Sequence, residues 1–484
     1  MKKAEMNKAE DIINLLTSWF EDSSDIVVTK KTYPDFTLKF MYCSQLIDMS
    51  RLNEVTPTIY QVWEKHQCLT YDLISNVLEI SKLKDLQKAK QKIEEKIFSG
   101  ELLVYSHDFD DLFFIPLSNI PKRSPEESNL ESSIRGPRDG LVENISDNMA
   151  LIRQRLKTSS LKSIEYSIGE RSRTKIVLQY IDDIINPSVL EDVKKRLDSI
   201  KVDIIVSSYE VEERLYDKTF SLFPLMDHSG RPDFAVKSLT QGRFVILVDG
   251  NPSCLIGPTN FNQTLYSPED MHDSFFYISL VRLLRITALL TTIFFPGLYI
   301  SLITFQIDQL PYSLVATISA SRLGLPFSAP IETLLMLTLF ELFKEAGIRL
   351  PKPVGQTVAV LGGLFIGDAA IRAGLTSPSC LVVISITVIS GYILINQSMS
   401  NNIVIMRIFV LFISSLLGLY GFFIAFFIII TALVSLQSFG YPYFSNIARP
   451  NREDTIKTLL RVPLKFMKKR NQAYQPVDGD SQRE

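Results

Sequence analysis

Cysteine and histidine are scarce in this chain: four of each occur among 484 residues, and neither type clusters. The cysteines (Cys43, Cys68, Cys254 and Cys380) have neither the spacing of metal ligands nor the density of a disulfide framework, which indicates a reducing compartment for the soluble part. No nucleophile elbow, phosphate-binding P-loop or zinc motif occurs. The sequence therefore predicts no enzyme, no metal site and no cofactor.

An excess of one charge and a signal peptide are also missing. The chain has 51 Lys and Arg against 53 Asp and Glu, and the bases are interleaved with acids, which excludes a basic stripe for nucleic acid. The N-terminus, MKKAEMNKAEDIINLLTSWFEDSSD, begins with positive charges but has no uninterrupted apolar core. We therefore do not expect a signal peptide, and we expect the large N-terminal region to stay in the cytoplasm.

Short periodic patterns fill the first half of the chain and predict two α/β subdomains. Alternating apolar residues predict a strand over 36–42, and ELLVYS and LFFIP predict a hairpin whose turn, HDFDD, could bind a metal but is more typical of a solvated turn. The helical stripe of LKDLQKAKQKIEEKIFSG ends at Gly100, a candidate C-cap. A polar, proline-bearing linker then leads into the second subdomain.

The second subdomain opens with an alternation of strand and helix patterns. TKIVLQYI, NPSVLEDVKKRLDSI and VDIIV predict a strand, a helix and a second strand, with Asn186 as N-cap and Pro187 at the first helical position. RFVILV and SCLIG predict two more strands around the turn DGNP.

Long apolar runs dominate the chain from Leu283 onward. Residues 283–305 and 403–436 exceed the about 20 residues that cross a hydrocarbon core, and 380–395 is a shorter uncharged run. Arg282 and Arg285 can snorkel to the headgroups at the entry of the first span. The tail after the last span is rich in Lys and Arg, so it too should be cytoplasmic, lying on an anionic leaflet or in solution.

Both ends on one side require an even number of crossings, and we predict four to six. The charged stretch IETLLMLTLFELFKEAG, between the first two apolar runs, is more typical of an interfacial, re-entrant or protein-buried helix than of a span. The expected fold is an N-terminal α/β region followed by an all-α polytopic membrane domain. Its parts are residues 1–120 and 135–270 for the soluble subdomains, 121–134 for the linker, 271–440 for the membrane domain and 441–484 for the tail.

A glycine-rich stretch, VAVLGGLFIGDAAIRAG, lies inside this apolar region and is the main candidate site. Ala359, Gly363 and Gly367 fall four apart, a small-residue stripe that lets membrane helices approach closely. Asp368 and Arg372 are also four apart and can pair on a helix. Two interpretations stay open: a structural ion pair in a packed bundle, or the border of a conduction path, because ionisable groups at membrane depth usually face a bundle interior or water.

On the second interpretation the candidate residues form two sets. The pore-lining candidates are Gly362, Gly363, Leu364, Phe365, Ile366, Gly367 and Asp368. The gating or charge candidates are Glu341, Glu345 and Arg372.

Several long blocks of the sequence resemble the A subunit of bacterial spore germinant receptors, the GerA family. They include RGPRDGLVENISDNMALIRQRLK, GRFVILVDGNPSCLIGP, ELFKEAGIRLPKPVGQTVAVLGGLFIGDAAIRAGL and SFGYPYFSN, and the resemblance extends from about residue 30 to about residue 470. It implies a multi-pass protein of the spore inner membrane. It also implies a transporter-like B subunit that binds the nutrient, a lipoprotein C subunit, and a homo-oligomer, suspected to be a pentamer, that forms a nutrient-gated channel for monovalent cations.

Two alternatives to a channel-forming receptor subunit remain. One is a non-conducting scaffold or signalling subunit of the receptor, and the other is a related accessory channel protein of the spore membrane.

Overall fold

The computed structural model describes twelve stretches of the chain, which form two compact units. The described residues are 17–20, 23–33, 36–66, 71–82, 89–106, 112–119, 135–218, 220–350, 367–444, 460–463, 469–470 and 472–480. The first unit comprises Met1–Thr219, Met226–Pro258 and Met467–Glu484, and the second comprises Phe220–Leu225 and Thr259–Phe466. The predicted linker 121–134 and the hairpin turn HDFDD lie outside the described residues.

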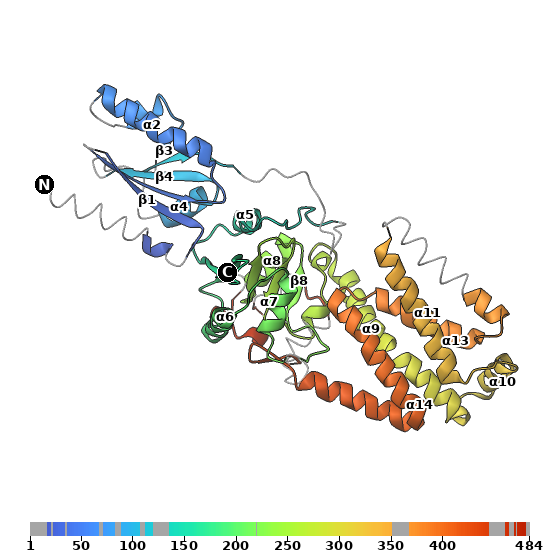
Figure 1. Cartoon of the computed structure of the whole chain (residues 1–484). Helices are drawn as coiled ribbons and strands as arrows, with labels where there is room; N and C mark the ends of the chain where they lie inside the picture. The colour runs from blue at the N-terminus through green and yellow to red at the C-terminus, as the bar shows by residue number, and fades with distance from the viewer. Residues whose placement is uncertain are drawn as a thin grey trace. The chain divides into compact units, whose positions relative to one another are not determined.

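The first unit begins with a five-stranded sheet that has one long helix on one face and a short one on the other (Figure 1). Its strands are β1 (Ile26–Thr32), β2 (Thr37–Cys43), β3 (Ser81–Lys82), β4 (Glu101–Ser106) and β5 (Leu112–Pro116), and its helices are α2 (Met49–His66), α3 (Tyr71–Ser75) and α4 (Ala89–Ile97). The strand order is β1-β2-β4-β5-β3, and every neighbouring pair is antiparallel. The hairpin predicted from ELLVYS and LFFIP is confirmed as β4 and β5.

Alternation along the strands sends side chains to both helices. Leu38 and Phe40 of β2 pack with Ile59 of α2, whereas Met41 of the same strand packs with Ile97 of α4. Past the end of α4, Gly100 has a φ of +85°, as expected of a glycine that ends a helix. The strand predicted over 36–42 is therefore confirmed, with the difference that α4 also covers its second face.

The second part of this unit is another antiparallel five-stranded sheet. Its strands are β6 (Leu161–Ile168), β7 (Thr174–Ile181), β8 (Asp227–Ser229), β9 (Phe244–Val248) and β10 (Cys254–Gly257), in the order β6-β7-β9-β10-β8. Its helices are α5 (Ile145–Arg155), α6 (Pro187–Ser199), α7 (Ser208–Leu215) and α8 (Pro232–Leu239). The predicted cap of α6 is confirmed, because the Asn186 side chain accepts a hydrogen bond from the amide of Ser188 and Pro187 opens the helix.

The strand predicted from VDIIV is wrong. Residues 202–206 form no strand, and their carbonyl groups instead accept hydrogen bonds from the turn between β6 and β7, at Glu170 and Arg171. Only Ile205 of this segment is deeply buried, while Ile204 and Val206 are exposed. Because β7 is flanked by β6 and β9, no sheet edge beside it is open to this segment.

A buried ion pair joins the two parts of the first unit. Arg153 of α5 donates from Nε to Asp25 over 2.7 Å, and its Nη1 and Nη2 donate to the carbonyls of Thr158 and Leu161, each over 3.0 Å. The guanidinium also lies 4.4 Å from the ring centre of Phe98. A charge this deeply buried is tolerated because the carboxylate, the two carbonyl groups and the aromatic ring all interact with the guanidinium.

The end of the chain belongs to the first unit. The amide of Val477 donates to the Ile184 carbonyl over 2.9 Å, Arg470 donates to the Thr240 carbonyl over 2.9 Å, and the ring of Tyr474 is buried. The short 3₁₀ helix η5 (Gln472–Tyr474) lies in this segment. The described tail residues 469–470 and 472–480 therefore pack on the first unit, an arrangement that neither expectation for the tail included.

The second unit is helical. Its α-helices are α9 (Phe275–Thr304), α10 (Tyr312–Arg322), α11 (Ala329–Arg349), α13 (Pro378–Tyr392) and α14 (Gln397–Val434), and residues 367–372 are also described as helical. The 3₁₀ helices η1 (Gln263–Leu265), η2 (Pro268–Met271) and η3 (Ile307–Gln309) and the strands β11 (Gln437–Ser438) and β12 (Tyr441–Pro442) complete it. Its core joins Ile300 of α9, Met336 of α11, Ile384 of α13 and Leu411 of α14.

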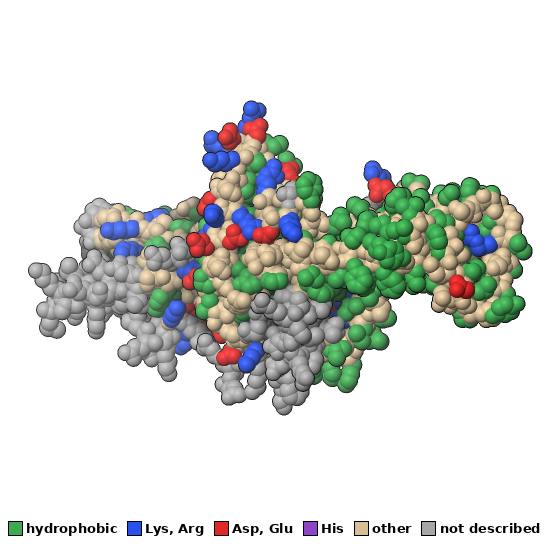
Figure 2. All heavy atoms as spheres, turned by 90° about the horizontal axis from the view of Figure 1, so that it is seen from below, with side chains coloured by type: hydrophobic (Ala, Val, Ile, Leu, Met, Phe, Trp, Pro, Cys, Tyr) green, Lys and Arg blue, Asp and Glu red, His purple; other side chains and the backbone are tan. Residues whose placement is uncertain are grey.

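Two described helices, α9 and the stretch Met399–Val434 of α14, are long and apolar enough to cross a membrane by length and composition, and α13 is a shorter apolar helix. Hydrophobic side chains cover much of the surface around these helices in the view of Figure 2. The long apolar run of α14 does not form one straight helix, however. Gly418 has a φ of +60° inside α14, and its two parts meet at an angle in Figure 1.

Candidate functional site

The predicted pore-lining stretch is described only at its end. Gly362, Gly363, Leu364, Phe365 and Ile366 lie outside the described residues, as does Ala359. Gly367 lies in the helix described over 367–372 and is buried against Leu381 of α13, where an added Cβ would lie 3.0 Å from the Leu381 Cδ2 atom. At this one position a small residue does permit close helix packing, as the stripe argument requires.

The charged residues of the stretch pair with each other on the surface of the helical unit. Arg372 Nε lies 2.9 Å from Asp368 Oδ2, which confirms the expected pair one helical turn apart. Both side chains are exposed, Asp368 by 59% and Arg372 by 79%. The described helices of one copy therefore do not enclose the pair.

The other two charge candidates lie one turn apart on α11. Glu341 receives contacts from two cations at 3.2 Å, Lys344 of its own helix and Arg407 of α14. Glu345 pairs with Arg349 over 2.7 Å, and both are largely exposed. Glu341 thus ties α11 to α14, whereas the Glu345 pair makes no contact beyond its own helix among the described residues.

Sequence reasoning missed Glu332, the most deeply buried carboxylate among the described residues of this unit. Glu332, in the first turn of α11, is fully buried, and its Oε1 accepts from the Ser377 amide at 2.6 Å, the Ser377 hydroxyl at 2.7 Å and the Thr376 hydroxyl at 3.0 Å. Its Oε2 accepts from Arg322 of α10 at 2.9 Å. The signal in the sequence was the run Thr376-Ser377-Pro378, a helix start that a buried acid can bind.

The arginines that open α9 do not reach outward as expected. Arg285 is buried, and its two terminal nitrogens hold the two oxygens of Asp270 in η2 at 2.7 and 2.9 Å. Arg282 stacks on the Tyr266 ring, 4.0 Å from its centre. The snorkelling interpretation is therefore wrong for Arg285, because a carboxylate from the preceding segment provides a partner closer than any headgroup.

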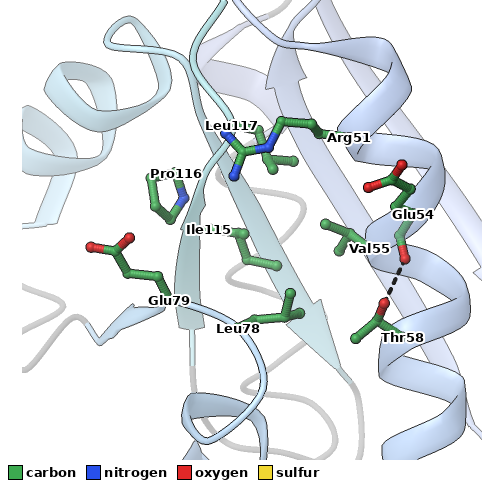
Figure 3. A pocket seen from close by; sticks show the side chains of 9 residues that line it. All are labelled: Arg51, Glu54, Val55, Thr58, Leu78, Glu79, Ile115, Pro116 and Leu117. Atoms are coloured by element: carbon green, nitrogen blue, oxygen red, sulfur yellow. Dashed lines mark hydrogen bonds between the residues drawn. The ribbon is translucent and has the colours of Figure 1, made fainter.

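A small surface cleft in the first unit lies between α2 and β5 (Figure 3). Its floor is apolar, and its charged groups, Arg51, Glu54 and Glu79, are exposed on the rim. The one hydrogen bond drawn in Figure 3 joins the Thr58 hydroxyl to the Glu54 carbonyl within α2. We assign no function to this cleft.

Comparison with known proteins identifies the family. The model for the Bacillus/Clostridium GerA spore germination protein matches residues 14–473, which is nearly the whole chain. The chain belongs to the GerA family. The resemblance found in the sequence blocks is thereby confirmed.

Curated members of the GerA family align along most of their length. Spore germination protein XA of Bacillus anthracis is 38% identical over 97% of this chain and 97% of its own. Spore germination proteins A1 and B1 of Bacillus subtilis are 32% and 36% identical, over 94% and 81% of this chain and the same shares of their own. Together with the family model, these matches assign this GerA chain to the germinant-receptor A-subunit family.

One solved structure is also similar to this GerA chain. It is the N-terminal domain of the A subunit of the Bacillus megaterium spore germinant receptor GerK3, at 24% identity and a TM-score of 0.40, covering 51% of this chain and 94% of that one.

Proposed function

We propose that this GerA protein is a subunit of a nutrient-gated channel for monovalent cations in the spore inner membrane. Copies of the chain, suspected to number five, assemble as a ring, with the helical unit in the membrane and both termini in the cytoplasm. A transporter-like B subunit binds the nutrient and a lipoprotein C subunit completes the receptor. Membership of a germinant-receptor family supports this assignment, and so do the apolar helices of the second unit.

The observation that carries the proposal is the exposed Asp368–Arg372 pair in a unit whose neighbouring helices are apolar. An ion pair facing hydrocarbon is costly, so such residues face water or another protein surface. A ring of identical subunits provides both kinds of surroundings. The pair of each copy would face either the next copy or a central water-filled path. A ring of Asp368 carboxylates would favour cations.

Potassium flux from vesicles containing the purified chain, with and without its partner subunits, tests the proposal. We expect flux from the native protein and a lower potassium-to-chloride permeability ratio for Asp368→Asn. The matched control is Asp192→Asn in α6, which breaks an ion pair of the same spacing, Asp192–Arg196, in the soluble unit and should leave selectivity unchanged.

Two results would contradict the proposal. One is the absence of flux from the native protein and from a Phe365→Ala variant, with and without the partner subunits. The other is an Asp368→Asn variant that loses partner binding or assembly while every conductance stays the same, which would indicate the scaffold alternative.

A further inference from the structure

A short excursion of the chain connects the two units. Residues Phe220–Leu225 belong to the helical unit, whereas the chain before and after them belongs to the soluble unit. Within the helical unit the Leu225 carbonyl accepts from the Ser438 hydroxyl over 2.8 Å, and the Phe223 ring lies 6.3 Å from that of Tyr443. Both contacts are with the segment that follows the last apolar helix.

One buried carboxylate in the soluble unit binds both ends of this excursion. Glu212 of α7 is fully buried. Its Oε1 accepts from the hydroxyl of Tyr216, which precedes the excursion, and its Oε2 is hydrogen-bonded to Nε2 of His228, which follows it. The Glu212 side chain therefore links the segment that leaves the first, soluble unit to the segment that re-enters it.

His228 is the member of this group that changes charge near neutral pH. Burial of its ring lowers the pKa of His228, but the hydrogen bond and charge of Glu212, with a smaller contribution from Asp227, more than offset burial and raise the pKa above its ordinary 6.5. The protonated ring is thus the form that the folded protein stabilises.

The two other acids near His228 on β8 and α8, Asp227 and Asp233, are paired with arginines. Asp227, its neighbour in β8, is held by Arg243 over 2.6 Å. Strand β10 places the uncharged Leu255 opposite His228. On α8, Asp233 pairs with Arg231 over 2.7 Å, and Lys237 lies in the last turn. On α7, which carries Glu212, the other charged residues are Glu210, Glu213 and Arg214; Arg214 donates to the Glu210 carbonyl over 2.7 Å, and Glu213 and Arg214 are exposed.

We propose that Glu212, Tyr216 and His228 form a proton-dependent clamp that holds the base of the Phe220–Leu225 excursion and weakens when His228 loses its proton. Because the pKa is raised in the folded state, the added stability is complete below about pH 6.5 and is lost as the pH rises through the folded-state pKa. The neutral ring can still donate one hydrogen bond, so the clamp loses only its charge-assisted part, which weakens it about five- to tenfold.

Amide hydrogen exchange of the full-length protein in lipid nanodiscs, from pH 5.5 to 9, tests the clamp. After correction for the intrinsic pH dependence of exchange, protection of residues 213–228 should fall about five- to tenfold in one single-proton transition centred above pH 6.5. His228→Gln keeps a side-chain donor but cannot titrate, and should give a flat profile. The control His66→Gln changes an exposed histidine at the end of α2 and should keep the transition.

The clamp is refuted if native protection does not change with pH, or if His228→Gln keeps the transition. A second measurement covers the case in which a variant misfolds: the titration midpoint of the His228 ring in the native protein, measured by exchange at its C2 proton. A midpoint at or below 6.5 overturns the proposal. None of these measurements involves conduction, so their outcome is independent of the channel assignment.

Discussion

Replacing Glu332 by Ala should loosen the corner at which α10, α11 and the start of α13 meet. The substitution removes the acceptor for the Ser377 amide, the Ser377 and Thr376 hydroxyls, and one terminal nitrogen of Arg322. Glu332 is fully buried, so no water is in place to replace these bonds.

The size of the effect follows from the burial of each partner. Removing one member of a buried ion pair costs about 3–5 kcal/mol. Because the Arg322 side chain is 19% exposed and can turn toward solvent, we expect the lower end, about 3 kcal/mol, for Glu332→Ala. Arg322→Gln leaves the carboxylate its three other donors and should cost only about 1–2 kcal/mol.

Cys380 gives a local readout because its thiol is buried beside this corner, 3.5 Å from the Thr333 hydroxyl. In a chain whose other three cysteines are replaced by Ala, maleimide labelling of Cys380 reports local opening. A change of about 1.4 kcal/mol alters the equilibrium constant for local opening tenfold. Cys380 should therefore be labelled about 100-fold faster in Glu332→Ala than in the parent, and about tenfold faster in Arg322→Gln. Glu345→Gln, on the exposed side of the same helix, should change the rate less than about twofold.

The double variant decides whether the pair acts as a unit. If Glu332 and Arg322 bind each other, the double variant should label at nearly the rate of Glu332→Ala alone, because the second change removes a partner already lost. Additive effects, or a Glu332→Ala rate equal to that of Glu345→Gln, would refute the geometry described for this corner.

Three further predictions concern other contacts of the same chain. Asp25→Ala should lower the free energy of unfolding of the soluble unit by about 3–5 kcal/mol in chemical denaturation, because it leaves the buried Arg153 charge unpaired; an effect below 1 kcal/mol would contradict the pairing. Gly297→Leu should reduce folding yield and thermal stability in detergent, since an added Cβ would lie 2.7 Å from the Val410 side chain of α14, whereas Gly324→Ala, in open space at a turn, tests the cost of a positive φ alone. Tyr474→Ala should expose residues 469–480 to added protease, because it removes a buried ring; unchanged protection would show that the ring does not hold the tail.

The elements that the sequence predicted correctly are those set by local patterns. The hairpin of β4 and β5 and the cap at Asn186 depend on residues within a few positions of one another. The segment 202–206 has the β-branched composition of a strand, yet its backbone pairs with the turn after β6. Composition predicts that such a segment is extended, but tertiary packing places it against the turn between β6 and β7 rather than in the ladder of the sheet.

The charged residues of the helical unit show the same limit. The Asp368–Arg372 pair was predictable because both residues lie on one helical turn. Arg285 and Glu332 were not, since their partners are 15 and 45 residues away and are chosen by tertiary packing. A buried acid and an exposed acid look alike in the sequence of α11, so burial separates Glu332 from Glu345 only once the fold is known.

The position of the C-terminal residues constrains the membrane topology without any argument from charge. Arg470 and Val477 bond to the carbonyls of Thr240 and Ile184, so the chain after the helical unit returns to the compact unit that it left. A bilayer cannot pass between groups in hydrogen-bond contact, so for a helical unit that spans the membrane we expect an even number of crossings within residues 259–466. Because α14 changes direction at Gly418, its two parts count separately. Two crossings result if α9 and one part of α14 cross the membrane. Four result if α9, α13 and both parts of α14 cross it.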